Sequence, residues 1–477
     1  MTISRRSLLA SSAAAGSLLL ADAVPAFAAK PAKQPNILFI MADDLGYADL
    51  SCYGRRDYKT PAIDKIAEEG MRFFQGYANS AVCSATRTGL MTGRYQNRLP
   101  IGLEEPLVIR NVGLPPEHPT LPSLLRAQGY QTALIGKWHL GQLPDYGPLK
   151  SGYDHFWGFR MGGIDYFRHG NSRGSDLWDG DVQIDEAGYL TDLFGNKAVE
   201  MVGEMAAAKK PFFMSLHFNA PHWPWEGPDD EAESDRIAAK KDPYGIRAFD
   251  GGSLKTYAAM VTRMDYQVGR VMDALRAAGI DNDTIVVFTS DNGGERFSDT
   301  WPFSGKKSEL LEGGLRIPVI IRWPGQVKAG STSEQVMITM DWLPTLVAAA
   351  GGKPDPAFPS DGIDLRPALG GHAAEPRTLC WRYMNLDQEA CRQGDYKYLK
   401  ILDQTFLFNV VEDPLERANL KERMPEKYAE LKAVFDAWDA TMLPLDPEAH
   451  TAGFSDNQMA DHFGIDSPIT TSVKKAD

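Results

Sequence analysis

The sequence contains little cysteine and, after its N-terminal segment, no long apolar run. Its four cysteines, Cys52, Cys83, Cys380 and Cys391, have no spacing typical of a zinc site. Cys380 and Cys391 are close enough in sequence to bridge a hairpin in an oxidising compartment, or they could be two reduced, partly buried thiols. No apolar run beyond the N-terminal segment approaches the ~20 residues of a membrane span, so we expect no transmembrane helix.

An excess of positive charge is also absent. The chain has 477 residues and a formal net charge of -13, which argues against non-specific binding to nucleic acids or to anionic membranes. If the substrate is anionic, the site must therefore supply positive charge locally. With 43% hydrophobic and 24% charged residues, the composition is globular and predicts one large domain, or one large and one small.

Residues 1–28 have the pattern of an export signal. Arg5 and Arg6 precede a small and apolar stretch that ends in Ala26-Phe27-Ala28, and we expect cleavage after Ala28. Ser-Arg-Arg followed by two leucines favours twin-arginine export over an ordinary secretory signal. We expect a soluble mature protein that is periplasmic or secreted. Because the twin-arginine route carries folded proteins, a modification or cofactor could be installed in the cytoplasm first.

Apolar runs that end in polar residues alternate with helix-like segments along the chain. Continuous apolar strands fit a sheet that is covered on both faces, and the alternation predicts an α/β fold with a large, mostly parallel sheet flanked by helices. In such sheets ligands bind at the carboxyl ends of the strands, where the polar residues collect. The expected strands are 36–44, 131–141, 211–222, 283–294 and 317–325, and the expected helices are 60–74, 120–130, 193–210, 254–279 and 337–352.

The pattern changes near residue 371. Short antiparallel strands are expected at LCWRYMN, YKYLKIL and TFLFNVV, and a helix is expected at PEKYAELKAVFDAWDATM. We therefore divide the chain into a signal peptide (1–28), a large α/β domain (29–370) and a C-terminal α+β subdomain with an antiparallel sheet and a tail (371–477). The tail from about residue 445 is weakly patterned and is expected to be a loop or a lid.

Four polar residues at strand ends suit a hard metal ion. Asp43 and Asp44 follow the first apolar run, and Asp291 and Asn292 follow the fourth. Three carboxylates and an amide can bind Ca²⁺, which takes about six to eight oxygen ligands, or Mg²⁺, which requires a stricter octahedron. Either pair alone could be an exposed loop or a turn. The presence of both pairs at strand ends favours one shared site, with Ca²⁺ preferred.

Five further residues could supply positive charge and hydrogen-bond donors to the same site: Arg87, Lys137, His139, His222 and Lys307. Each has an ordinary alternative, such as a solvated lysine at a strand end or a packing histidine. Together with a dication they would make the site positive, which suits a dianion-like transition state. His217 lies inside an apolar strand, and we expect it to belong to the core.

The stretch AVCSATRTGLMTGRY (81–95) predicts a short helix that begins near Cys83, because serine and threonine favour helix N-termini. Cys83 and Arg87 are four residues apart and would share a helical face. A helix N-terminus and an arginine would lower the pKa of the thiol, so a thiolate nucleophile is one hypothesis. A thiolate is a poor partner for a Ca²⁺-like ion, however, and an oxygen nucleophile would fit the site better.

The same stretch resembles the signature of the sulfatase family, in which the cysteine is oxidised to formylglycine. The resemblance covers nearly all of the mature chain in order, through ADDLGYADLSCYG (42–54), ALIGKWHLG (133–141), NAPHWP (219–224), TSDNGG (289–294), GKKSELLEGGLRIP (305–318) and FNVVEDPLERANL (408–420). It implies that Asp43, Asp44, Asp291 and Asn292 bind Ca²⁺, with modified Cys83 as the fifth protein group. It further implies that Arg87 and His139 orient the formylglycine, and that Lys137, His222 and Lys307 bind sulfate or assist the leaving group. Lys307 is preferred to Lys306 because it stands five residues before Glu312 in the Glu-Gly-Gly pattern.

The resemblance implies hydrolysis of an aryl or carbohydrate sulfate ester to inorganic sulfate and an alcohol. One hydroxyl of the hydrated aldehyde attacks sulfur, and the other then loses a proton and expels sulfate. A formylglycine-generating enzyme is the implied partner during maturation. Ala85 stands where the family usually has proline, and it lacks the fixed φ of proline, so we expect less complete conversion of Cys83.

Two other functions are alternatives to this one. A phosphatase or phosphodiesterase on the same scaffold would more naturally use serine or threonine with two metals. A non-catalytic binder of sulfated glycans would keep Cys83 unmodified, and the lysine, histidine and arginine set argues against it.

The alcohol could be aryl, sugar or alkyl. Five tryptophans could form walls for it or could pack in the core: Trp157, Trp178, Trp223, Trp225 and Trp301.

Overall fold

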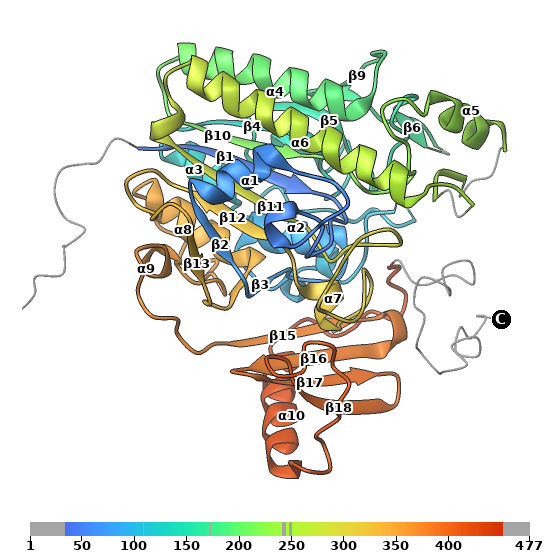
Figure 1. The fold of residues 1–477 in the computed structure, drawn as a ribbon, viewed down its shortest axis with the longest axis vertical. Coiled ribbons are helices and arrows are strands. Elements are labelled where there is room, and N and C mark those ends of the chain that lie inside the picture. Colours follow the sequence, from blue (N-terminus) through green and yellow to red (C-terminus); the bar gives the residue numbers. More distant parts are fainter. Residues whose placement is uncertain (1–33, 108, 172, 241–244, 248–249, 452–477) are drawn as a thin grey trace, which may run out of the picture. The chain divides into compact units, whose positions relative to one another are not determined.

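The computed structural model describes residues 34–451, except residues 108, 172, 241–244 and 248–249. The expected signal peptide and the end of the expected tail lie outside the described residues. In the part of the chain that is described, we find no helix that combines the length and the apolar character needed to span a membrane. Figure 1 shows a large central sheet with helices on both faces and a second sheet built from the last strands.

The central sheet has ten strands in the order β13-β2-β12-β11-β1-β10-β4-β5-β8-β9. Its middle strands β11, β1, β10, β4 and β5 are parallel, and antiparallel strands flank them on both sides. The predicted mostly parallel α/β sheet is therefore confirmed. The strands are β1 (Asn36–Ala42), β2 (Met71–Phe73), β4 (Gln131–Lys137), β5 (His155–Phe159), β8 (Trp178–Asp179), β9 (Val182–Gln183), β10 (Phe212–His217), β11 (Thr284–Ser290), β12 (Val319–Arg322) and β13 (Ser331–Ser333).

Helices cover both faces of this sheet, which explains why its central strands are apolar throughout. Successive residues of a strand point to opposite faces. Accordingly, Phe39 and Met41 pack in the cluster that contains α2, α3 and α8, whereas Leu38 and Ile40 pack with α1, α4 and α6. The helices are α1 (Pro61–Glu68), α2 (Cys83–Thr92), α3 (Leu121–Ala127), α4 (Leu190–Ala207), α6 (Leu254–Ala277) and α8 (Trp342–Ala349).

Side chains at the helix starts explain two of these boundaries. The Thr120 hydroxyl accepts a hydrogen bond from the Ser123 amide at the start of α3, and the Ser253 hydroxyl accepts one from the Thr256 amide at the start of α6. The helix expected over 337–352 begins only at Trp342. The preceding residues form strand β14 (Met337–Ile338), which pairs with β3 (Gly76–Tyr77), and a 3₁₀ turn.

The second sheet is antiparallel throughout, as predicted. Its strands are β15 (Thr378–Tyr383), β16 (Gln388–Gln393), β17 (Tyr396–Ile401) and β18 (Gln404–Asn409). Helix α10 (Pro425–Asp439) packs against it through Leu431 and Phe435. Cys380 and Cys391 lie opposite each other on β15 and β16, with their sulfur atoms 2.9 Å apart, and both are free thiols in this structure.

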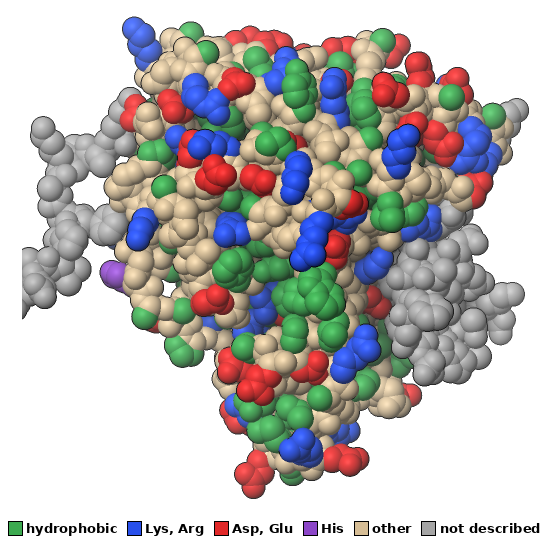
Figure 2. Space-filling model, in the orientation of Figure 1, with side chains coloured by type: hydrophobic (Ala, Val, Ile, Leu, Met, Phe, Trp, Pro, Cys, Tyr) green, Lys and Arg blue, Asp and Glu red, His purple; other side chains and the backbone are tan. Residues whose placement is uncertain are grey.

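Short elements complete the described chain: α5 (Glu231–Ala239), α7 (Glu312–Leu315), α9 (Arg366–Leu369), β6 (Gly170–Asn171) and β7 (Gly174–Ser175). On the face shown in Figure 2, acidic and basic side chains are interspersed rather than gathered into a basic patch. This distribution agrees with the acidic net charge and gives no sign of a nucleic-acid surface on that face.

Candidate active site

The carboxyl ends of four neighbouring parallel strands bring the predicted polar residues to one edge of the sheet. Strands β11, β1, β10 and β4 are adjacent in this order. Asp291 and Asn292 follow β11, and Asp43 and Asp44 follow β1. Lys137 ends β4, with His139 two residues later, and His222 lies five residues after the end of β10.

Backbone contacts between these strand ends fix the loops that carry the polar side chains. The Asp43 amide donates to the Ala220 carbonyl at 3.2 Å, and the Asp291 amide donates to the Ala42 carbonyl at 3.2 Å. Asp44 and His139 have φ values of 61° and 56°, in the left-handed region that costs energy for residues other than glycine. Such strain persists only where the surrounding structure imposes it, and it is frequent at functional sites.

Helix α2 places Cys83 against the two aspartates that follow β1. The helix begins at Cys83 itself, so the prediction of a cysteine at a helix N-terminus is confirmed. The preceding Val82 offers no side-chain cap. The Cys83 sulfur lies 3.3 Å from Asp43 Oδ1 and 3.8 Å from Asp44 Oδ1, and all three side chains are buried.

The oxygen atoms of this cluster have the composition of a hard-cation site. Asn292 Nδ2 donates to Asp44 Oδ1 at 2.8 Å, and the Asp44 amide donates to Asp291 Oδ1 at 3.2 Å. Ligand atoms of Asp43, Asp44, Cys83 and His222 lie within 4.8 Å of one another. Asn292 Oδ1 is buried and has no hydrogen-bond partner among the described residues. A buried orphan oxygen beside three carboxylates fits a calcium-like ion, which binds oxygen ligands.

Three buried cations pair with the three carboxylates. Lys137 Nζ lies 2.6 Å from Asp43 Oδ2, and Lys307 Nζ lies 2.7 Å from Asp44 Oδ2. Arg87 donates to Asp291 Oδ2 from Nε at 3.1 Å and from Nη2 at 2.8 Å. The choice of Lys307 agrees with these contacts, because its neighbour instead donates to the Arg296 carbonyl.

The electrostatics of the cluster favour a further positive charge. Burial, and then the neighbouring Asp291 carboxylate, raise the pKa of Asp43 to about 8 despite Lys137. The pKa of Asp291 is lowered, because Arg87 and Lys137 outweigh the opposing effect of burial. A dication between these carboxylates would favour the charged form of both groups.

The Cys83 thiol behaves differently from the prediction. A helix N-terminus and Arg87 were expected to lower its pKa, but burial, and then Asp43, raise it well above the usual value. The reason is that Arg87 turns its guanidinium to Asp291, whereas the carboxylates of Asp43 and Asp44 face the sulfur. This environment opposes a thiolate nucleophile.

Two histidines border the cluster as neutral rings. Burial, and then the nearby lysines, lower the pKa of both His139 and His222 well below the usual value. His222 Nδ1 lies 2.7 Å from the Trp223 carbonyl and therefore donates to it, which leaves a lone pair on Nε2, 3.6 Å from Asp44 Oδ2. Neither ring nitrogen of His139 has a partner among the described residues, and a β-carbon added at Gly162 would lie 2.7 Å from this ring.

The structure thus brings all ten predicted site residues to one place, and it adds one that the sequence analysis assigned to the core. His217 is buried, as expected, but its Nδ1 lies 3.2 Å from Arg87 Nη1. The sequence could have indicated a place for His217 in the site, because it is the last residue of β10 and other polar residues of the site also lie at or just after strand ends.

The tryptophans divide into buried and accessible ones. Trp157 and Trp225 are buried in the core. Trp178 lies against the buried Arg160 guanidinium. Trp223 is partly exposed, and its ring centroid lies 4.1 Å from that of His222. Trp301 is 66% exposed.

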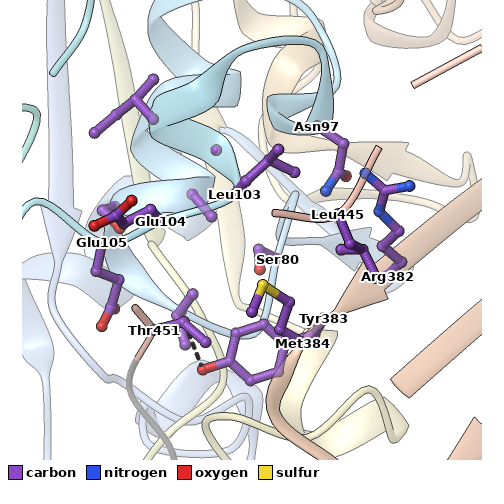
Figure 3. A pocket seen from close by; sticks show the side chains of 15 residues that line it. Ser80, Asn97, Leu103, Glu104, Glu105, Arg382, Tyr383, Met384, Leu445 and Thr451 are labelled. Atoms are coloured by element: carbon purple, nitrogen blue, oxygen red, sulfur yellow. Dashed lines mark hydrogen bonds between the residues drawn. The ribbon is translucent and has the colours of Figure 1, made fainter. Parts of the chain in front are cut away.

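The cavity in Figure 3 lies beside the first turn of α2 and is lined by Val82, Ser84 and Ala85 but not by Cys83. Thr451 donates to the Tyr383 hydroxyl at its edge, at 3.2 Å. Its volume of about 20 Å³ accommodates a water molecule rather than a sugar ring. We therefore do not assign it to the substrate.

Comparisons with known proteins agree with this geometry. The family model described as Sulfatase matches residues 35–352. The chain is 32% identical over 408 residues to an N-acetylgalactosamine-6-sulfatase of Canis lupus familiaris, covering 80% of this chain and 74% of that protein. It is 31% identical to arylsulfatase A of Homo sapiens, covering 80% and 77%. The crystal structure of Ps i-CgsB in complex with k-i-k-neocarrahexaose superposes with a TM-score of 0.79 at 30% identity, covering 88% of this chain and 96% of that chain. The chain therefore belongs to the sulfatase family and is a sulfuric ester hydrolase.

Proposed function

We propose that this protein removes sulfate from carbohydrate sulfate esters by means of a formylglycine made from Cys83, with one Ca²⁺ held by Asp43, Asp44, Asp291 and Asn292. The observation that carries the proposal is the place of the Cys83 sulfur, 3.3 Å from Asp43 Oδ1 and within a cluster that also contains Lys137 and Lys307. A side chain at position 83 therefore lies next to both the carboxylates and the lysines of the cluster.

The donor set supports calcium. Three buried carboxylates and the orphan Asn292 oxygen are hard ligands, and modified residue 83 would add a fifth protein group. When bound, the ion would supply Lewis-acid polarisation to the sulfate, and the hydrated aldehyde would supply the attacking hydroxyl.

The remaining residues of the cluster would form the binding site for the sulfate group. Lys137 and Lys307 hold two fixed positive charges, one on each of the two aspartates that contact residue 83. Because both are buried, they would stabilise negative charge more strongly than in water. His222 presents the lone pair of Nε2 toward the same space, so the ring would assist the leaving oxygen only after taking up a proton at Nε2, while His139 and Arg87 would orient residue 83.

Burial constrains when Cys83 can be modified. The side chain is only 2% exposed in the folded chain, so a formylglycine-generating enzyme must act before folding is complete. Modification in the cytoplasm before folded export, through the twin-arginine signal predicted for residues 1–28, fits this order.

A carbohydrate is the favoured alcohol. One relative is named N-acetylgalactosamine-6-sulfatase, and one structural neighbour was crystallised in complex with k-i-k-neocarrahexaose. The partly exposed ring of Trp223 beside His222 would offer a sugar a stacking surface next to the leaving oxygen.

The test is a panel of sulfated mono- and disaccharides, 4-nitrophenyl sulfate and 4-nitrophenyl phosphate, assayed with and without a chelator. We expect release of inorganic sulfate that the chelator abolishes, and no release from the Cys83→Ala variant. Faster hydrolysis of the phosphate ester would favour the phosphatase alternative. Activity that the variant retains would contradict the proposal.

A further inference from the structure

Arg87 has a buried neighbour that the proposed chemistry does not use. His217 ends β10, opposite Met41 of β1 and Gly136 of β4, and it is 2% exposed. Its ring packs edge-on against Phe39, with centroids 6.3 Å apart. A core residue of this kind could have any apolar side chain, so its polar edge requires an explanation.

The polar edge of His217 faces the Arg87 guanidinium. Arg87 Nη1 lies 3.2 Å from His217 Nδ1 and 3.2 Å from the Lys137 carbonyl. His217 Nδ1 also lies 3.3 Å from the Lys137 carbonyl, to which it would donate if it carried the proton, and Nε2 has no hydrogen-bond partner among the described residues. Because an arginine offers only donors, a hydrogen bond from Arg87 to Nδ1 requires the other tautomer, with the lone pair on Nδ1 and the proton on Nε2. Burial, and then Arg87, lower the pKa of His217 to about 3, which keeps the ring neutral and able to accept.

The contact with His217 engages Nη1 of the Arg87 guanidinium, together with the Lys137 carbonyl. Nη1 donates to the Lys137 carbonyl and to His217, while Nε and one hydrogen of Nη2 face Asp291. Of the five N–H groups of arginine, one on Nη2 is left. Nη2 lies 4.0 Å from Asp43 Oδ1, the atom that the Cys83 sulfur contacts at 3.3 Å.

We propose that His217 is a positioning residue that locks the Arg87 guanidinium, so that its one uncommitted N–H is held on the side of residue 83. The inference rests on the proposed function, because residue 83 is the group that Arg87 would orient. Without an acceptor at Nδ1, a buried Nη1 hydrogen would lose its partner, and the guanidinium would rotate toward another one.

The test replaces His217 in two ways. His217→Phe keeps a ring of similar size but removes the acceptor, and we expect kcat for 4-nitrophenyl sulfate to fall roughly ten- to a hundredfold with KM little changed. His217→Asn keeps an oxygen acceptor at the place of Nδ1 and should recover most of that loss. The formylglycine content of each variant, measured by peptide mass spectrometry, normalises the rates.

Two controls separate positioning from packing. Phe39→Leu disturbs the same contact surface without touching the acceptor, and it should lower Tm but leave kcat within about twofold. In an Arg87→Lys background the Nη1 donor is absent, so adding His217→Phe should change kcat by less than about twofold. Equal losses for His217→Phe in the two backgrounds, or a His217→Asn variant as slow as His217→Phe, would overturn the inference. A wild-type protein without sulfatase activity would instead overturn the proposed function.

Discussion

Two of the clusters of buried charged side chains in the described residues are paired differently. In the active-site cluster, Asp43, Asp44 and Asp291 come from two loops and face one another. In the second cluster, which joins α7 to the C-terminal sheet, one carboxylate is surrounded by partners. Glu312 Oε1 lies 3.0 Å from Lys397 Nζ, and its Oε2 lies 2.6 Å from Arg316 Nε.

The pKa values of Glu312 and Asp43 are shifted in opposite directions. Lys397 and Arg316 overcome burial at Glu312 and hold its pKa below the usual range. At Asp43, burial and the Asp291 carboxylate outweigh the effect of Lys137, and the pKa rises to about 8. In the second cluster, Glu416 Oε1 has no hydrogen bond within the described part of the chain but lies 2.9 Å from Lys397 Nζ, and burial raises the pKa of Glu416 to about 7. In the active-site cluster, the amide oxygen of Asn292 has no hydrogen-bond partner among the described residues, and in this sense we call that cluster incomplete and the second one complete. We therefore take the unpartnered Asn292 oxygen, rather than the pairing of the carboxylates, as the feature that distinguishes a ligand site from a structural cluster.

The largest effect should come from removing the group at the centre of the incomplete cluster. Cys83→Ala removes the precursor of the nucleophile, and we expect sulfatase activity to fall by at least about 10³-fold. The free energy of unfolding should change little, by about 1 kcal/mol. Steady-state assays and thermal melts measure the two quantities. A large loss of stability would show that Cys83 is mainly structural.

The complete cluster should show the reverse pattern. Lys397→Met leaves the buried Glu312 and Glu416 without their shared cation, which lies 3.0 and 2.9 Å from them. We expect a cost of about 3–5 kcal/mol in the free energy of unfolding. At low temperature, kcat for each formylglycine-bearing molecule should stay close to that of the wild type.

Its matched control is Lys400→Met on the same strand, where the ion pairs to Asp387 and Glu389 are partly exposed and should contribute about 0–1 kcal/mol. If Lys397→Met were no more damaging than this control, the second cluster would not be a structural one.

Metal removal should distinguish the clusters without any mutation. A chelator would leave the carboxylates of the active-site cluster facing one another, so we expect activity to be lost and Tm to fall. Calcium at a hundred times its Kd would stabilise the fold by about 2.7 kcal/mol. On chelation, the Lys397→Met variant should lose about as much stability as the wild type, because the substituted residue lies outside the metal site. An unchanged melt and activity after complete chelation would contradict a metal site.

A smaller effect should follow from crowding the site. Gly162→Ala would place a methyl group 2.7 Å from the His139 ring, and we expect kcat to fall roughly tenfold as the ring is displaced. The control is Gly203→Ala in α4, where a β-carbon meets nothing within 4 Å and should stabilise the helix slightly. Equal activity of the two variants would show that the His139 ring does not need its observed position.

The smallest effect is expected at the rim of the site. Trp223→Ala should raise KM for a sulfated disaccharide by about three- to tenfold and change kcat less. A minimal aryl sulfate should be nearly unaffected, because it is too small to need the stacking surface. Equal losses of kcat and kcat/KM with the aryl sulfate would count against a role in substrate binding.

Much of the active-site cluster could be predicted because parallel strands place their carboxyl ends together. Asp43 and Asp291 could be grouped from their positions after apolar runs alone. Lys307 follows no strand, and the choice of Lys307 over Lys306 depended on the family resemblance. The contact of His217 with Arg87 could not be predicted, since strand periodicity places a residue on a face of the sheet but does not identify its neighbour across the core. The cluster around Glu312 was missed for the same reason, because Lys397 is distant in sequence.

The function proposed for the active-site cluster depends on an oxidised residue 83. Tandem mass spectrometry of the peptide that carries this residue, from active protein matured in a host with a formylglycine-generating enzyme, tests it most directly. The account predicts an aldehyde, lighter than the thiol by the exchange of sulfur for oxygen and the loss of two hydrogens. A peptide that is wholly thiol in fully active protein would contradict it.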